Sequence, residues 1–579
     1  MLDPYRMVIV NLIGLFILAI GTLIYKFVYP KKTINLSFLL ILISILTTIS
    51  IFRNGVYESG DFNIHLYRTI SFYQSLSEGN LMPSWAGDLN ANYGYPLFIF
   101  NYSLPYYIIS LFHFLGITFI TSMKIFLASS MVLSGVFMYL FSQKIFKNNL
   151  AAFVSGVFYV FAPYHLIDLH FKVVIGEILF FTLLPLTFIF VNKLRIRKDF
   201  APSLLFGLSF TFLIASHVVL ALFSGILIFF YLFLYTRKKE IKILAPKIFF
   251  GFLTGGIASL YIWLTPFFLT QYTFIQRVGL HSVYFPGILE LLYSPYFAGF
   301  LFQGPKGEIS NLIGYTQLFV LLAILFLLII GKLPKQYTLN IKFWLFSSII
   351  LIFLITPYSK FIWEAIPFIK ATGSHRLLVI LAFCISILAG YFTIIFRNKK
   401  LFIYLVILLT IASSILNWGQ RRMITDIDDN FLKVNLWKST SEGEGHFYAN
   451  SKWVSDINHP WFSILPTNRI NVLNGSGEIT NIQRLSTKHL YSISAKTPLV
   501  LEENTLYFPG WEVKINGEKA PISPTNKGTI TFKIPQGKQL LQLKYEDIFI
   551  YKLLKIISLI GLLFIISYVT AKRYLFKDA

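Results

Sequence analysis

Long apolar runs separated by short polar connections fill most of the first 417 residues, and one more run lies near the carboxyl end. A helix needs roughly 20 apolar residues, or slightly fewer, to cross the hydrocarbon core of a membrane, and about thirteen segments meet this description. They centre on residues 7–25, 35–52, 123–142, 150–167, 174–192, 202–216, 218–235, 247–268, 315–331, 342–357, 377–396, 400–417 and 552–570. The pattern predicts an α-helical polytopic membrane protein.

After Trp418 the pattern changes to short alternating runs such as "TITFKI" and "LLQLKY", which predict strands. The pair Asn516–Gly517 stands between "WEVKI" and "EKAPI", and this dipeptide favours a tight hairpin turn. Trp461, Tyr507 and Trp511 could be sugar-stacking platforms, but aromatic side chains in strands more often belong to a core, which we expect here. A small β-rich domain is therefore predicted near the carboxyl terminus.

These two patterns divide the chain into three parts. The predicted parts are a multi-span body (1–417, with its first outer loop at 53–122), a β-rich domain (418–549) and a last transmembrane helix with its tail (550–579). We find no clear internal repeat, which counts mildly against transporters built from two related halves.

Composition and charge fit a membrane protein and indicate its orientation. Hydrophobic residues make up 56% of the chain, charged residues only 13%, and the net charge is +24. The positive charge gathers in every second connection, which is typical of cytoplasmic loops. The net positive charge is thereby explained without a nucleic-acid partner. We therefore expect a cell-membrane protein with its amino terminus, 53–122 and 418–549 outside and its carboxyl terminus in the cytoplasm.

The first outer loop holds the first group of candidate site residues. From Asp61 to Ser77 apolar residues recur at spacings of three and four, which predicts an amphipathic helix lying on the membrane surface. Asp61, His65 and Arg68 form a second stripe along one edge of this helix. A second, shallow helix is predicted at 104–115.

Two interpretations of this stripe stay open. In the simpler one, Asp61 caps the helix and Arg68 meets lipid phosphates. In the functional one, Asp61 takes a proton from an acceptor hydroxyl when a sugar on a lipid carrier arrives. General bases typically contribute about 10²- to 10⁴-fold in rate.

A second group follows the fourth predicted span. Asp168 lies between His165 and His170, and Glu177 begins the next span. A divalent metal is an alternative here, but the spacing matches no closed ligand pattern. We expect Asp168 to orient substrate or to pair with Lys172, and Glu177 is either merely solvated near the interface or part of the site.

A third candidate is Arg376, which follows "ATGSH" and opens the 377–396 span. Its guanidinium and the first N–H groups of that helix would together form an anion seat, although an interfacial Arg without a ligand is the simpler alternative. His217, Arg277 and His281 are weaker candidates of the same kind.

Two stretches of the first loop carry a family resemblance. "SGDFNIHLYRTISFYQSLSEGNLMPSW" and "GYPLFIFNYSLPYY" resemble the first outer loop of the GT-C superfamily of membrane glycosyltransferases, especially the bacterial branch labelled "6-pyruvoyl-tetrahydropterin synthase-related". "LYFPGWEVKINGEK" and "IPQGKQLLQLKY" are similar to the outer domain of bacterial membrane proteins implicated in glycosylating cell-wall polymers. The chain departs from many members in carrying an extra span, 7–25, before the loop.

The resemblance implies an inverting glycosyltransferase with a polyprenyl-phosphate-linked sugar as donor and an extracytoplasmic polymer, lipid or protein as acceptor. It implies that Asp61 is the catalytic base and that Arg376 binds the donor phosphate. The other candidate substrate-binding residues are His65, Arg68, Asp168, His170 and Glu177. No cofactor is implied.

Two other functions stay open. A transporter or lipid flippase would place paired ionisable groups near span centres, whereas charges in this sequence cluster at span ends. A lipid-linked polymer ligase would use the same chemistry with a larger donor.

Overall fold

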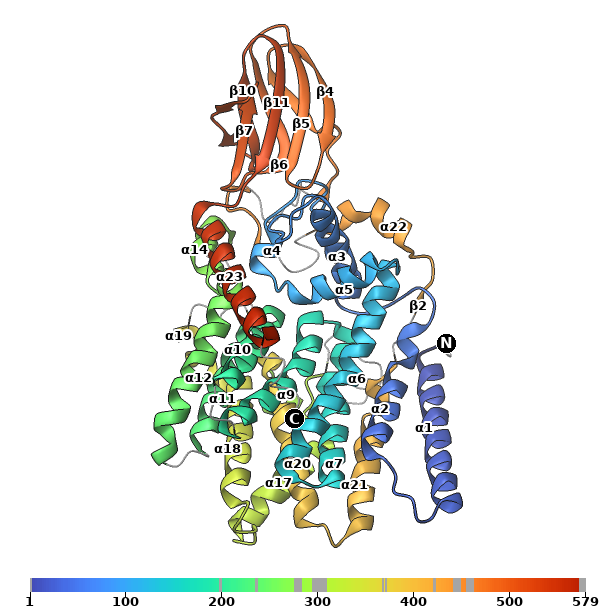
Figure 1. The fold of residues 1–579 in the computed structure, drawn as a ribbon. Helices are drawn as coiled ribbons and strands as arrows, with labels where there is room; N and C mark the ends of the chain where they lie inside the picture. The colour runs from blue at the N-terminus through green and yellow to red at the C-terminus, as the bar shows by residue number, and fades with distance from the viewer. Residues whose placement is uncertain are drawn as a thin grey trace.

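The computed structural model describes residues 3–196, 200–234, 238–274, 284–293, 310–366, 369, 372–419, 423–440, 449–454 and 463–571. Most of the helices form one bundle, and most of the strands stand together at one end of it (Figure 1). The predicted fold class, a helical membrane body with a β-rich part near the carboxyl terminus, is confirmed.

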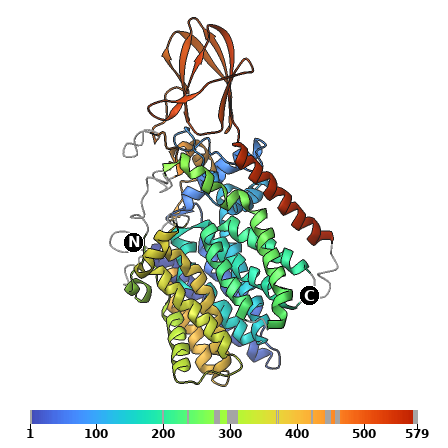
Figure 2. The same cartoon turned by 90° about the vertical axis from the view of Figure 1, so that its left-hand side faces the viewer.

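The helices of the bundle follow one another along the chain. In order they are α1 (Asp3–Val28), α2 (Leu36–Thr48), α6 (Phe119–Phe146), α7 (Asn149–Val160), α8 (Pro163–Ile167), α9 (Ile175–Ile196), α10 (Ala201–Ser216), α11 (Val218–Leu234), α12 (Lys238–Ala258), α17 (Tyr315–Ile329), α18 (Thr338–Ile355), α20 (Leu378–Ile395), α21 (Lys400–Ser413) and α23 (Phe549–Ala571). Long segments separate α2 from α6, α12 from α17 and α21 from α23. Figure 2 shows α23 in red, running obliquely along the outside of the body.

Shorter helices and turns lie between and beyond these helices. They are η1 (Ile49–Phe52), α3 (Phe62–Ser77), α4 (Leu97–Phe100), α5 (Leu104–Phe114), η2 (Asp168–Lys172), α13 (Leu260–Trp263), α14 (Thr265–Leu269), η3 (Thr270–Tyr272), α15 (Ile288–Leu292), η6 (Pro357–Ser359), α19 (Lys360–Ala365), η8 (Ser374–Leu377), η9 (Ile415–Asn417), α22 (Asp429–Val434) and η10 (Leu436–Lys438). The predicted shallow helix at 104–115 is α5 and is confirmed.

Each predicted span overlaps a helix, but the count of thirteen spans is not confirmed. Within the described residues, seven helices are long and apolar enough to cross a membrane, or eight if α7 and the segment Pro163–Lys172 form one span bent by 47°. The five other predicted spans coincide with shorter apolar helices. The predicted span 247–268 is divided, because α12 ends at Ala258 and α13 and α14 follow.

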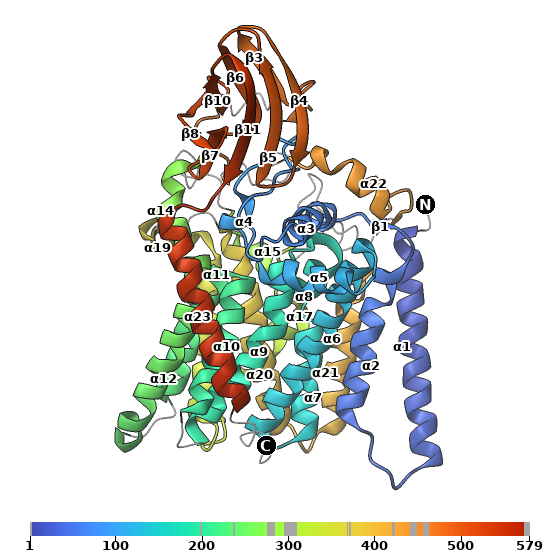
Figure 3. The ribbon, with the colours of Figure 1, turned by 45° about the horizontal axis from the view of Figure 1, so that its top comes forward.

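The basic connections and the strands lie at opposite ends of the bundle. The connections α1–α2, α17–α18 and α20–α21, which carry lysines and an arginine, are at the end away from the strands (Figure 1). Helices α3 and α5 lie at the other end, between the bundle and the strands (Figure 3). The charge asymmetry read from the sequence therefore corresponds to two distinct ends of the molecule.

The strands form two large antiparallel sheets and one short pair. The strands are β1 (Val56–Tyr57), β2 (Met423–Ile424), β3 (Ile470–Asn474), β4 (Gly477–Arg484), β5 (Lys488–Ala495), β6 (Leu499–Leu506), β7 (Trp511–Ile515), β8 (Glu518–Ala520), β9 (Ser523–Pro524), β10 (Thr529–Ile534) and β11 (Gly537–Tyr545). The sheet orders are β1-β2, β3-β6-β10-β9 and β4-β5-β11-β7-β8. Alternate residues of β11, including Leu541 and Leu543, are buried, as the period of two predicts.

The hairpin and the core role of Trp511 are confirmed. Asn516 and Gly517 have φ of 51° and 93° between β7 and β8, which is the left-handed backbone that this turn requires. Trp511 is 4% exposed. Tyr507 is half-buried, and Trp461 lies outside the described residues.

The first outer loop is packed against the strands of the carboxyl-terminal part. The Trp85 indole, 1% exposed, lies 5.4 Å from the Trp511 ring and 5.3 Å from the Tyr545 ring. Val56 in β1 pairs with Ile424 in β2, so the first outer loop also pairs, strand to strand, with the segment that follows α21. These contacts hold the loop that presents Asp61.

Candidate functional site

Asp61 precedes α3 but does not use its side chain as a helix cap. The Ser59 hydroxyl accepts the hydrogen bond from the Phe62 amide at 3.2 Å, and Asp61 makes no side-chain cap bond. The interpretation of Asp61 as a capping residue is therefore wrong. Within the described part of the chain its carboxylate accepts no hydrogen bond, and its side chain is half-buried, so it remains available to a substrate.

Helix α3 is covered by protein on both of its predicted stripes. His65 and Arg68 are 2% and 1% exposed, and the apolar residues Phe62, Leu66 and Ile70 are buried as well. The apolar stripe of α3 is covered by protein rather than by lipid, because α5, α6 and α22 pack against it, and its position at the membrane surface stays a prediction. Its polar stripe faces the interior of the molecule.

Two tyrosines of the segment after α4 hold the imidazole of His65. The Tyr106 hydroxyl lies 2.9 Å from His65 Nδ1, and the Tyr102 hydroxyl lies 3.3 Å from Nε2. Tyr102 is also close enough to Asp61 and Arg376 to feel both charges. His65 therefore links α3 to the polar residues at the ends of the neighbouring spans.

A strained turn follows the bend after α7 and contacts the loop of Asp61. The turn η2 ends at Lys172, and the next residue, Val173, has a φ of 60° and a ψ of 48°, which are unusual for a β-branched residue. Asp168 stabilises this turn, since its Oδ1 accepts the Val174 amide at 3.0 Å and its carbonyl accepts the Val173 amide at 2.6 Å. The Lys172 carbonyl in turn accepts the Asp61 amide at 2.8 Å.

The side chain of Glu177 is fully buried and binds two cations. The Arg376 guanidinium forms an ion pair with Glu177 Oε1, and Lys172 Nζ lies 3.6 Å from Oε2. The Tyr164 hydroxyl donates to Oε2 at 2.7 Å. The side chains of Arg376 and Lys172 are 28% and 12% exposed, whereas that of Glu177 is 0% exposed.

Burial and charge act in opposite directions on Asp61. Burial raises the pKa of its carboxyl above the ordinary value near 3.8, while Arg68, Arg376 and Lys172 lower it and Glu177 raises it. The net result is a raised pKa. A carboxylate of this kind is a better proton acceptor than an ordinary exposed aspartate.

The structure brings some of the predicted site residues together and corrects the predictions for others. Arg68, Glu177 and Arg376 surround Asp61 closely enough to shift its pKa. Of the two alternatives for Glu177, the merely solvated one is wrong, because its side chain is buried and paired. Asp168 does not pair with Lys172; within 4 Å, Lys172 reaches Glu177 instead.

The histidines near Asp168 do not form a metal site with it. Among the described residues no group of three His, Cys, Asp or Glu side chains is arranged to hold a metal ion. His165 stacks on Phe181 at 3.9 Å, and His170 is buried beside Phe171. Of the weaker candidates, Arg277 and His281 lie outside the described residues.

Sequence reasoning missed the tyrosines of the site. Tyr164 and Tyr102 bind Glu177 and His65, but tyrosine is common throughout this chain, with 33 copies. The proline after the α7 run is a signal that could have drawn attention to Tyr164, because prolines mark helix breaks and irregular backbone within a membrane often lies at functional positions.

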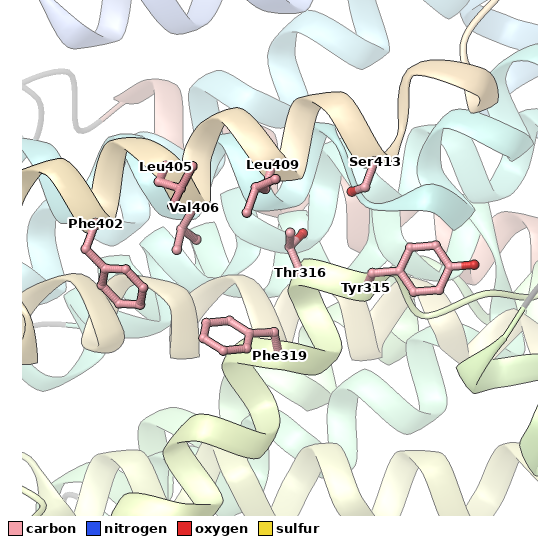
Figure 4. A pocket seen from close by; sticks show the side chains of 8 residues that line it. All are labelled: Tyr315, Thr316, Phe319, Phe402, Leu405, Val406, Leu409 and Ser413. Atoms are coloured by element: carbon pink, nitrogen blue, oxygen red, sulfur yellow. The ribbon is translucent and has the colours of Figure 1, made fainter.

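A separate, mostly apolar pocket lies between α17 and α21. Figure 4 shows side chains from both helices around it. Its lining residues are Tyr315, Thr316, Phe319, Phe402, Leu405, Val406, Leu409 and Ser413. None of the candidate site residues lines this pocket.

The fold and the site describe a polytopic helical membrane protein with a polar cluster at one end of its bundle. A sequence model of the family described as "6-pyruvoyl-tetrahydropterin synthase related domain; membrane protein" matches residues 99–422, which is more than half of the chain. The protein belongs to this membrane protein family, which confirms the predicted branch, while the matched residues begin after the stretch 59–85 of the first outer loop.

Two further comparisons are more distant. An uncharacterized protein of Lactococcus lactis subsp. cremoris (strain MG1363) is 25% identical over 355 residues, which cover 60% of this chain and 52% of the relative. The chain thus spans about half the length of that relative. The crystal structure of the Archaeoglobus fulgidus oligosaccharyltransferase with a tethered acceptor peptide is 12% identical, with 75% of this chain and 59% of that chain covered and a TM-score of 0.37. A likeness at this level does not establish a shared activity.

Proposed function

We propose that this protein is an integral membrane glycosyltransferase. It moves a sugar from a polyprenyl-phosphate donor to an extracytoplasmic acceptor, which is a cell-envelope polymer, a lipid or a protein. The observation that carries the proposal is that a carboxylate and two cationic side chains lie at the same place. Asp61 offers a carboxylate without a hydrogen-bond donor among the described residues, and Lys172 and Arg376 offer cations beside it.

The chemistry follows from these roles. Asp61 accepts the proton of an acceptor hydroxyl as the oxygen attacks the anomeric carbon of the donor sugar. The bond between that carbon and the phosphate oxygen breaks, and the electron pair leaves with the polyprenyl phosphate. Arg376 stabilises the negative charge of the leaving phosphate, and the single displacement inverts the anomeric configuration.

The distribution of charge supports the proposed orientation. The connections rich in lysine lie at the end of the bundle opposite α3, which Asp61 precedes, and opposite the strands (Figure 1). Basic connections face the cytoplasm in most membrane proteins, which would place Asp61, α3 and the strands outside the cell. A lipid-linked donor facing the outer leaflet would reach the site from the bilayer.

The test is a comparison of two aspartates from the same loop. Wild type, Asp61→Asn and Asp88→Asn are reconstituted in lipid with a panel of polyprenyl-phosphate sugars and an extract of outer-surface polymers, and release of polyprenyl phosphate is measured. Asp61→Asn is expected to lower turnover by about 10²-fold or more. Asp88→Asn is the matched control, because Asp88 lies in the same loop but is not among the groups that act on Asp61.

Equal turnover of Asp61→Asn and wild type would rule out Asp61 as the base. The same panel distinguishes the other functions. A flippase would move the lipid-linked sugar across the bilayer without releasing polyprenyl phosphate, and a ligase would accept only long donors. The placement of Glu177 near the start of α9 and of Arg376 just before α20 favours the enzyme, since a transport path would place such pairs near span centres.

A further inference from the structure

Lys172 makes contacts through both its backbone and its side chain. Its carbonyl accepts the Asp61 amide at 2.8 Å, its ammonium lies 3.6 Å from Glu177 Oε2, and its ammonium also lies 4.3 Å from the centre of the Tyr164 ring. The side chain nevertheless keeps 12% of its surface exposed. The ammonium is therefore held between Glu177 and Tyr164, while part of the side chain remains open.

The exposed fractions of the side chains show which side of the cluster is accessible. The Glu177 side chain is 0% exposed, whereas Arg376, on the other oxygen of the same carboxylate, is 28% exposed. The carboxylate thus lies behind the two cations, and the cations form the accessible side. Two cations on the Glu177 carboxylate leave one positive charge, and Arg68 offsets the charge of the neighbouring Asp61, so an anion in front of the two cations meets a net positive charge.

The turn that ends at Lys172 is strained in a way that supports a binding role. Val173 adopts a left-handed backbone that costs a β-branched residue free energy, and Asp168 holds it there with two hydrogen bonds. Val173 stands between Lys172 at the end of η2 and α9, which carries Glu177, so its left-handed backbone sets the direction in which the chain enters α9.

We infer that Lys172 is a second anion-binding residue, which forms with Arg376 a two-cation seat for the phosphate of a lipid-linked substrate. The inference rests on the proposed function for the identity of the lipid, but the seat itself would bind any accessible phosphate monoester or diester. Lysine acts here as a point charge, and Arg376 supplies the planar, directional donors.

The experiment measures phosphate binding separately from sugar transfer. Full-length protein in nanodiscs is titrated with polyprenyl monophosphate and, in a second arm, with inorganic phosphate. Lys172→Met is expected to weaken polyprenyl monophosphate binding at least tenfold, Lys172→Arg to bind within a few fold of wild type, and Lys360→Met to bind as wild type does. Lys360 is the control because it also pairs with a glutamate, at 3.8 Å, but is exposed and outside the cluster.

A second measurement on the wild-type protein covers the case in which Lys172→Met does not fold. Acetylation of Lys172 by an amine-reactive reagent is followed by mass spectrometry with and without polyprenyl monophosphate. Protection of Lys172, with Lys360 labelled equally in both conditions, supports the inference. Unchanged labelling of Lys172 at saturating lipid, or normal binding by folded Lys172→Met, overturns it.

The outcomes separate the inference from the proposed function. Loss of polyprenyl monophosphate binding in Lys172→Met with no sugar transfer by wild type supports the seat and rejects the transferase. Sugar transfer by wild type with equal KM for the donor in Lys172→Met supports the transferase and rejects the seat. Binding of inorganic phosphate as tight as that of the lipid would assign the seat to a free phosphate rather than to a lipid headgroup.

Discussion

The body and the sheets each contain a fully buried glutamate bound to an arginine and a tyrosine. In the body, Glu177 pairs with Arg376 and accepts from Tyr164 at 2.7 Å. In the sheets, Glu503 pairs with Arg484 at 2.5 Å and accepts from Tyr491 at 3.1 Å. The two clusters contain the same residue types, so the presence of such a cluster alone does not identify a site.

The difference lies in what surrounds each pair. In the sheet cluster Arg484 is 17% exposed, but its guanidinium also donates to the Asn92 carbonyl at 3.0 Å and the Thr505 hydroxyl at 3.3 Å, and the third group, His489, is 2% exposed. In the body cluster the third group is the partly open Lys172. The sheet cluster joins the first outer loop to the strands, whereas the body cluster has charge available for a ligand.

The largest expected difference between the two clusters is in turnover, after each has lost its arginine. Arg376→Gln and Arg484→Gln each leave a buried glutamate without its main partner, and each should destabilise the protein by about 3 kcal/mol or more. Turnover per folded molecule should fall sharply only in Arg376→Gln. Thermal unfolding in detergent and release of polyprenyl phosphate by the folded fraction are measured together. Equal specific turnover in both variants would mean that the body cluster, too, is only structural.

Local sequence patterns account for most of the fold. The apolar runs are long enough to give the helices, and Asn516–Gly517 defines the β7–β8 hairpin because its turn needs a backbone that few residues adopt. Helix α3 was predicted within one residue of its observed start, but its surroundings were not. An apolar stripe has the same spacing whether lipid or α5 covers it, so the pattern could not distinguish the two.

The candidate site depends on contacts that no local pattern contains. Glu177 and Arg376 are 199 residues apart and meet only because α9 and α20 share the core of the bundle. Asp61 could be predicted because it precedes an amphipathic helix in a polar loop of an otherwise apolar chain. Lys172 was noticed only as a partner for Asp168, since sequence spacing cannot show that a strained turn directs it to Glu177.

A smaller difference between the clusters, in donor KM, is expected when each loses its tyrosine hydroxyl. Tyr164→Phe and Tyr491→Phe each remove one hydroxyl that donates to a buried carboxylate, which should cost about 1.5–3 kcal/mol in either cluster. Tyr164→Phe should also weaken donor binding, because the Tyr164 hydroxyl is 2.5 Å from Lys172 Nζ and helps to fix the ammonium. Donor KM is compared with unfolding temperature in both variants. A raised KM in Tyr491→Phe would show that the sheet cluster influences the site at a distance.

The smallest expected effect is a shift in the pH dependence of kcat/KM. It can be measured in any variant that keeps some activity. As a base Asp61 must be ionised, so kcat/KM should fall as the pH drops through its raised pKa. Lys172 lowers the pKa of Asp61 and Glu177 raises it. Lys172→Met should therefore move the acid limb of the profile to higher pH, and Glu177→Gln should move it to lower pH.

The opposite signs make this pair of variants informative, because a general loss of structure would not move the two limbs in opposite directions. Glu503→Gln is the matched control, since the sheet cluster does not act on Asp61 and its acid limb should coincide with that of wild type. Shifts of the same sign in Lys172→Met and Glu177→Gln, or none in either, would mean that the titrating group is not Asp61. Opposite shifts would connect the open cluster of the body, and not the closed one of the sheets, to the proton transfer.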